Sequence, residues 1–181
     1  PTYVFEDHGA TSAVELWQQS NPLPFPYGRS GAPFGWLDNT AWWIWDRAIS
    51  GLAHPQGTIY GSKQFTLTGT RKLIIDSAGD DAYELYLNGV LLCARKMEED
   101  GSTWTRLART EVTVGPGTHT LRFSCTNEGG GTGNIGGFIC SVFNQATGAL
   151  ICHTDSSWKV IGYPTEIGQT PGEILTVLLQ D

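Results

Sequence analysis

The segment Tyr83–Leu92, which reads YELYLNGVLL, constrains the fold more than any other part of the sequence. Asn88 and Gly89 are the preferred pair for a two-residue type I′ turn, and residues that favour β-strands flank them on both sides. The segment therefore predicts a β-hairpin.

Strand-like segments also occur on both sides of this hairpin, about ten residues apart, with turn signals between them. Residues 77–81 are expected to form a turn, and residues 98–103 a polar loop. No helical period of convincing length appears between residues 40 and 165. This pattern predicts an all-β fold, an antiparallel β-sandwich. The further strands are expected at 71–76, 109–114, 118–126, 137–143, 149–154 and 158–161.

The two ends of the chain differ from the middle. Residues 1–40 are expected to form an extended segment, because the prolines in 21–26 exclude helix there, and this segment either wraps the sandwich or links it to a preceding domain. Residues 41–165 form the predicted sandwich. Thr170, Pro171 and Glu173 are typical of a helix start, so residues 166–181 are expected to be a linker and a truncated C-terminal helix that opens the next domain. We therefore expect a module of a larger protein.

Charge and composition exclude several classes of partner. The 181 residues carry 11 Lys and Arg against 18 Asp and Glu, a formal net charge of −7. The densest basic cluster is Arg95–Lys96, so nucleic acid and anionic membrane surfaces are poor partners. Apolar runs fall far short of the roughly 20 residues that cross a bilayer, which predicts no membrane insertion. Cys93, Cys125, Cys140 and Cys152 permit disulfides, but buried free thiols are favoured.

Several motifs follow one another between residues 41 and 160. They are Trp43-Ile44-Trp45, DDAYELYLNG at 80–89, GTHTLRF at 117–123, Gly136-Gly137-Phe138 and TDSSWK at 154–159. Taken in this order, they resemble the galactose-binding-like jelly-roll domains of glycoside hydrolases and phage tail proteins. The resemblance implies a jelly-roll β-sandwich over roughly residues 41–160, with Trp43, Trp45 and Trp158 in its core.

The C-terminal sequence TPGEIL at 170–175, with Leu178 and Leu179, resembles a junction in minor tail proteins of siphophages that infect actinobacteria. This resemblance implies a minor tail protein in the virion, assembled in the host cytoplasm. Its partners would be a host cell-wall glycan and other tail proteins, with a homo-oligomer as one option.

Aromatic and amide side chains are the candidates for carbohydrate binding, because aromatic rings cover the apolar face of a sugar while acids and amides bond its hydroxyls. Trp104 and Trp36 are the tryptophans expected to be exposed, although most tryptophans in a sandwich belong to the core. Glu98 lies in the polar loop before Trp104. Asn127 and Glu128 open a glycine-rich loop that could close on a ligand or serve as a permissive connection.

The sequence gives little indication of a metal site or a catalytic site. Asp80 and Asp81 could contribute to a structural calcium site, but adjacent acids before a hairpin more often form turns. No cofactor is expected. The four histidines are dispersed and no nucleophile elbow is present, so we expect no enzyme.

Three functions remain open. The first is a non-catalytic phage tail domain that binds host cell-surface carbohydrate. The second is an architectural spacer or oligomerisation domain of the tail. The third is an accessory carbohydrate-binding module of a glycoside hydrolase.

Overall fold

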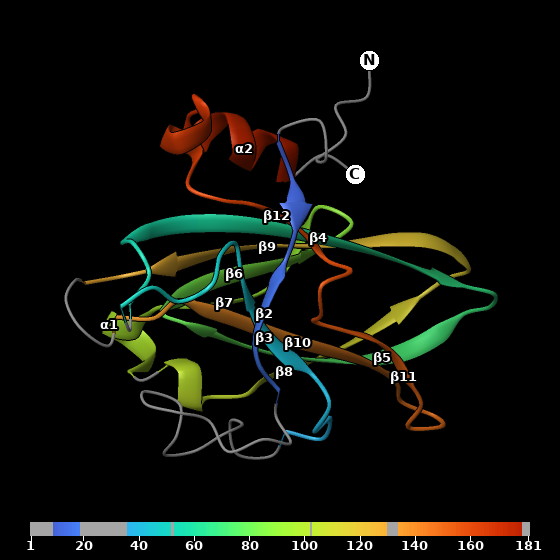
Figure 1. Ribbon diagram of the computed structural model, residues 1–181. Coiled ribbons are helices and arrows are strands. Elements are labelled where there is room, and N and C mark those ends of the chain that lie inside the picture. The colour runs from blue at the N-terminus through green and yellow to red at the C-terminus, as the bar shows by residue number, and fades with distance from the viewer. Residues whose placement is uncertain (1–8, 19–35, 52, 102, 130–133, 179–181) are drawn as a thin grey trace.

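The computed structural model describes residues 9–18, 36–51, 53–101, 103–129 and 134–178 (Figure 1). The proline-rich segment 21–26 and residues 130–133 of the glycine-rich loop lie outside these ranges. The chain forms two antiparallel sheets that stack face to face, which confirms the predicted all-β sandwich.

Sheet A contains the predicted hairpin. Asn88 and Gly89 have φ values of +50° and +79°, as a type I′ turn requires. The order of the strands in this sheet is β1 (Thr11–Ser12), β12 (Lys159–Ile161), β4 (Gly57–Leu67), β9 (Gly117–Asn127), β6 (Ala82–Leu87) and β7 (Val90–Arg95).

Sheet B lies opposite, with β10 at its centre. β10 pairs with β5 on one side, and on the other side with β3 near its start and β11 near its end. The strands are β2 (Val14–Gln18), β3 (Trp42–Trp45), β10 (Gly137–Asn144), β5 (Arg71–Asp80) and β8 (Ala108–Val114), with β11 (Leu150–His153).

The main core lies between the sheets and is rich in aromatic rings. Phe123 of β9 stacks on Phe138 of β10 with ring centroids 3.9 Å apart, and Trp158 packs beside both. Trp43, Trp45 and Trp158 are fully buried, as predicted. Trp45 packs in the main core, whereas Trp43 packs with Ala41, Ala78, Ile135 and Ile139 in a separate group, here called the outer-face cluster.

Two local predictions were wrong. Residues 77–80 are not a turn, because they pair with residues 137–140 and so extend β5 to Asp80. The chain therefore crosses from sheet B to sheet A at Asp81 alone. The polar loop 98–103 overlaps a short helix, α1 (Met97–Asp100), and the 3-10 turn η3 (Thr103–Thr105). Asp100 of α1 accepts a hydrogen bond from the main-chain N–H of Lys96 at 2.8 Å, which holds this helical turn.

The two ends of the chain contribute to the sandwich. β1 and β2, from the segment predicted to wrap it, add a strand to each sheet. After the 3-10 turn η4 (Pro164–Ile167), the helix α2 (Pro171–Leu178) lies over the outer side of sheet A (Figure 1). Ile174 of α2 is fully buried against Tyr60, Tyr86 and Ile161. In the described part of the chain, no helix is long and apolar enough to cross a membrane.

Candidate functional site

One side of the sandwich presents two strand edges to each other. β12 pairs with β4 only at Tyr60–Ser62, so among the described strands residues 63–67 of β4 have β9 as their neighbour on one side alone. β11 likewise pairs only with β10. Between these edges lies a cavity of about 410 Å³, here called the edge groove.

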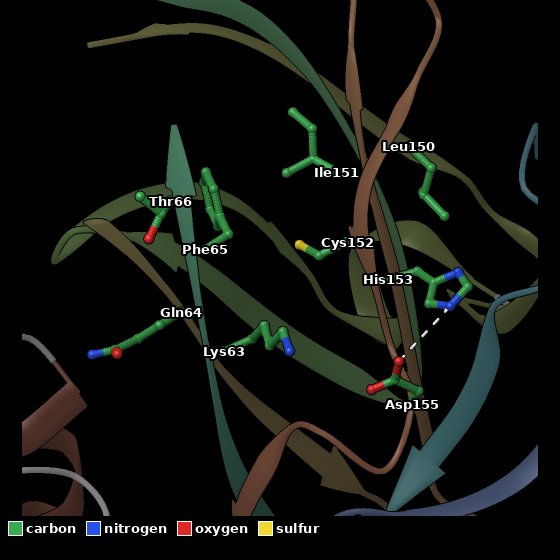
Figure 2. Close-up of a pocket in the computed structure, with 9 residues that line it drawn as sticks. All are labelled: Lys63, Gln64, Phe65, Thr66, Leu150, Ile151, Cys152, His153 and Asp155. Carbon is green, nitrogen blue, oxygen red and sulfur yellow. Dashed lines mark ion pairs between the residues drawn. The ribbon is translucent and has the colours of Figure 1, made fainter. Parts of the chain in front are cut away.

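Figure 2 shows the residues of β4 and β11 facing each other across the edge groove. Successive side chains of a strand point to opposite faces of the sheet, so a run of consecutive lining residues means that the strand's edge forms the wall. The groove therefore offers main-chain N–H and C=O groups as well as side chains. Its lining is Lys63, Gln64, Phe65, Thr66, Leu150, Ile151, Cys152, His153 and Asp155.

One end of the edge groove is charged. His153 Nε2 lies 3.9 Å from an oxygen of Asp155 (Figure 2), and Lys63 Nζ donates to the Ser157 hydroxyl at 2.6 Å. Burial raises the pKa of the Cys152 thiol to about 12, with Asp155 adding to the rise and Lys63 opposing it. Cys152 therefore stays a neutral thiol at pH 7 and lacks the thiolate that a reactive cysteine needs.

Asp38 orients His153, the histidine that lines the edge groove. His153 Nδ1 lies 2.6 Å from Asp38 Oδ2, and this hydrogen bond is the main reason why the pKa of His153 is raised. Burial alone would raise the pKa of Asp38, but its bonds to His153, Thr40 and Ser141 hold it well below its ordinary value. Nδ1 of His153 is therefore engaged by Asp38, whereas Nε2 lies on the side of the edge groove, near Asp155.

The structure brings Trp36 and Trp104 to one place, although 68 positions separate them in the sequence. Both are partly buried and pack against the outer-face cluster of sheet B. Glu98 is exposed on α1, which precedes Trp104 along the chain. The predicted aromatic residues therefore share a face of the molecule, but neither lines the edge groove.

Asn127 and Glu128 lie at the end of β9 and have different environments. The Asn127 side chain is fully buried, and its amide donates to the main-chain oxygens of His54, Pro55 and Asn134. Its position therefore suits it to holding loops together rather than to contacting a ligand from solvent. Glu128 is exposed, and its main-chain N–H donates to Asp81.

Asp80 and Asp81, the candidate calcium ligands, lie where the chain crosses from β5 to β6. Both side chains are buried, and Asp81 Oδ2 accepts the Glu128 N–H at 2.6 Å. Within the described ranges, no three His, Cys, Asp or Glu side chains come together in a way that could hold a metal ion.

Sequence reasoning missed the edge groove. Lys63 and His153 are 90 positions apart, and neither belongs to a recognisable motif. The late start of β12 at Lys159 is the one local signal. Asp155, Ser156 and Ser157 form a turn before Trp158, which predicts that β12 cannot begin early enough to pair with Lys63.

Comparison with known proteins finds solved structures of similar fold. No known protein family and no curated protein matches the sequence. The α-L-rhamnosidase of Streptomyces avermitilis, solved with L-rhamnose, is similar in structure, with 20% identity and a TM-score of 0.61 over 90% of this chain and 15% of that one. The likeness shows the fold.

A lectin is also similar in structure, with a lower TM-score. The lectin of Pleurotus ostreatus in complex with GalNAc has 20% identity and a TM-score of 0.52 over 90% of this chain and 39% of that one. Its apo form gives 19% and 0.52, over 89% and 42%. This chain therefore spans less than half of the chains it resembles, and the neighbours are consistent with a galactose-binding-like fold.

Proposed function

We propose that this chain is a non-catalytic carbohydrate-binding module, and that the edge groove holds a sugar unit. The proposal rests on the volume and the lining of the edge groove. It has a volume of about 410 Å³, which lies within the roughly 300–1,000 Å³ of small-molecule sites, and it combines an apolar wall with a charged end.

The two parts of the groove suit the two kinds of surface on a sugar ring. Leu150, Ile151 and Phe65 supply apolar contact for the C–H face. Asp155 accepts hydrogen bonds from sugar hydroxyls, while Lys63 and the free strand edges offer donors. Because the whole chain has a net charge of −7, a neutral glycan is a better ligand than an acidic polymer.

The fold neighbours support this class of ligand, since their structures contain L-rhamnose and GalNAc. Because proteins with the same fold can have different functions, the main support for this ligand class is the chemistry of the edge groove. We propose a non-catalytic role because glycoside hydrolysis needs two carboxylates on opposite sides of the scissile bond. Asp155 is the one carboxylate among the described residues that line the groove.

Titration of the purified chain with a panel of neutral monosaccharides and disaccharides tests this proposal. We expect weak, saturable binding that falls at least about tenfold in the Lys63→Ala variant, the usual effect of losing a charge-assisted hydrogen bond. Lys72→Ala is the matched control, because Lys72 pairs with Glu111 on the other sheet.

Trp104→Ala separates the edge groove from the face predicted by the sequence. Loss of binding in Trp104→Ala, with Lys63→Ala unaffected, would move the site to the outer-face cluster. No binding of any sugar to the unaltered chain would reject the module as a carbohydrate binder.

The wider setting that we propose is a phage tail, where many copies of a weak module would raise avidity through effective concentration. The sequence resemblance at residues 170–179 supports this setting. Detection of the chain by mass spectrometry in purified virions would test it. Absence from the virion would favour a glycoside hydrolase accessory module.

One observation favours an architectural role as the second candidate. Val90 and Leu91 expose 66% and 50% of their surface on β7, the terminal strand of sheet A, where unpaired edges can join another chain. Light scattering of the isolated chain decides between them. A defined oligomer that dissociates in Leu91→Lys supports the architectural role, and a monomer at all concentrations removes it.

A further inference from the structure

The outer face of sheet A carries a second hollow, of about 190 Å³, away from the edge groove. It lies over the main chain of Tyr83, whose side chain points inward to the core. Glu84 stands opposite Ala94 and Ser124 in the strand register, and Ala82 stands opposite Thr126. Directly opposite residues share a face of a sheet, so these side chains surround one spot. The hollow is named the face hollow, and the residues that line it are Ala82, Tyr83, Glu84, Ala94, Arg95, Lys96, Ser124 and Thr126.

The hollow exists because small side chains occupy neighbouring positions on three adjacent strands. Ala82, Ala94, Ser124 and Thr126 rise little above the sheet. Beside them stand larger side chains: Tyr86 follows Glu84 on the same face of β6, and Tyr60 stands opposite Ser124 on β4. The result is a flat floor with a wall along one side.

Helix α2 packs against Tyr86 of this wall, and Tyr86 in turn orients the carboxylate of Glu84. The Tyr86 hydroxyl donates to Glu84 Oε2, and Tyr86 packs with Tyr60 against the buried Ile174 of α2. Burial, with help from Glu84, raises the pKa of Tyr86 to about 12, so the hydroxyl remains a donor throughout the neutral range. Glu84 therefore has a fixed orientation at the edge of the hollow.

The opposite corner carries positive charge. Lys96 lines the hollow from the end of β7, and its main-chain N–H is held by Asp100 at 2.8 Å. The same Asp100 pairs with Arg95 at 3.4 Å. The turn into α1 thus fixes the Lys96 main chain beside the hollow, while its ammonium group stays exposed.

We propose that the face hollow is a second binding site, for a single sugar-sized ring that carries a carboxylate. Ring hydroxyls donate to Glu84 and exchange hydrogen bonds with Ser124 and Thr126. The ring's C–H face lies on the methyl groups of Ala82 and Ala94, and its carboxylate faces Lys96. The volume of about 190 Å³ is below that of drug-sized sites, which restricts the ligand to one ring.

This site differs from the edge groove in place and in chemistry, and it does not depend on that groove being occupied. The edge groove lies between strand edges and suits a neutral glycan. The face hollow lies on the face of β6, β7 and β9, with a carboxylate and an ammonium at its two corners. A chain with both sites would bind one neutral and one acidic unit.

Nuclear magnetic resonance titration of the isotope-labelled chain with glucuronic acid tests the proposal, with glucose as the neutral comparison. We expect glucuronic acid to shift the amide signals of Ala94 and Ser124. Lys96→Ala should weaken its binding about tenfold while leaving that of glucose unchanged. Shifts at Cys152 and His153 report the edge groove separately, so failure at one site is not confused with failure at the other.

Filling the hollow provides the second variant. Ser124→Leu should abolish the shifts at Ala94, whereas Thr113→Leu, on the exposed face of β8, should leave them intact. Glucuronic acid that produces no shift at residues 82–96 or 124–126 of the unaltered chain overturns the proposal. Unchanged binding in Ser124→Leu with the fold intact overturns it as well.

Discussion

His153 and Asp38 join the edge groove to the loop that precedes β3, with Nδ1 of the histidine 2.6 Å from Oδ2 of the carboxylate. Asp38 also accepts a hydrogen bond from Ser141 of β10 at 3.0 Å. One carboxylate thus connects β10, β11 and the segment that leads into the tryptophan strand. The connection makes stability depend on pH.

The His153–Asp38 pair should stabilise the protein more in mild acid than in base. The pKa of His153 is raised, so its contribution is fully present below the ordinary histidine value of about 6.5 and is lost as the pH rises through the higher folded value. Asp38, whose pKa is lowered, contributes above about 3.8. We expect His153→Ala to cost about 1–3 kcal/mol near pH 5.5 and less near pH 9.

Chemical denaturation of both proteins across this range measures the difference. Comparison with His153→Ala also removes the opposing effect of His54, whose pKa burial lowers and whose contribution is lost as the pH falls below about 6.5. A difference that is the same at all pH values would contradict the prediction.

Arg109 and Asp76 should form the most costly ion pair to break. Asp76 is fully buried, and Arg109 donates to both of its carboxylate oxygens, at 2.7 and 2.9 Å. Removing Arg109 strands a buried charge, so Arg109→Ala should lower the free energy of unfolding by about 3–5 kcal/mol. Lys72→Ala, which breaks a pair of half-exposed side chains, should cost less than about 1 kcal/mol. Equal losses in urea denaturation would contradict this account.

The sequence predicted the fold where the signals were local. The Asn88–Gly89 turn needs two positive φ values, and few residue pairs other than Asn-Gly meet this demand so well. The burial of Trp43, Trp45 and Trp158 followed from their place in the motifs. Residues 77–81 were misjudged because small and acidic residues are typical of turns, whereas here pairing with β10 overrides that preference.

The candidate sites could not be predicted in the same way, because they depend on strand order. The edge groove requires β4 and β11 to lie at the open side of the sandwich, and apart from the turn at Asp155–Ser157 nothing near Lys63 or His153 in the sequence indicates this. The face hollow depends on the register that sets Ala82, Ala94 and Ser124 side by side. Trp36 and Trp104 were each predicted to be exposed, but both are partly buried because the fold packs them against the outer-face cluster, which the sequence does not indicate.

Gly61 should tolerate no larger residue. A Cβ at this position of β4 would lie 2.0 Å from Cε1 of Phe123, a ring already stacked on Phe138. Gly61→Ala should therefore cost about 1–3 kcal/mol, which lowers the Tm by several degrees for a chain of this size. Gly115→Ala is the control, since nothing lies within 4 Å of its Cβ. Calorimetry that finds the two variants alike would refute the packing argument.

Ile174 decides whether α2 belongs to the sandwich or begins another unit. The sequence predicted a helix that opens the next domain, yet Ile174 is fully buried against Tyr60, Tyr86 and Ile161 on sheet A. If this contact supports the fold, Ile174→Ala should lower the free energy of unfolding by about 2–4 kcal/mol. Thr176→Ala, on the exposed side of the same helix, should change it by less than about 0.5 kcal/mol.

Hydrogen exchange locates the effect of this change. We expect the amides of Tyr60 and Tyr86 to lose protection in Ile174→Ala, while Phe123 in the main core keeps it relative to the new global stability. Unchanged stability and unchanged exchange at both tyrosines would mean that α2 only rests on sheet A. In that case the packing of Tyr86, and with it the orientation of Glu84, would depend on Tyr60 and Ile161 rather than on α2.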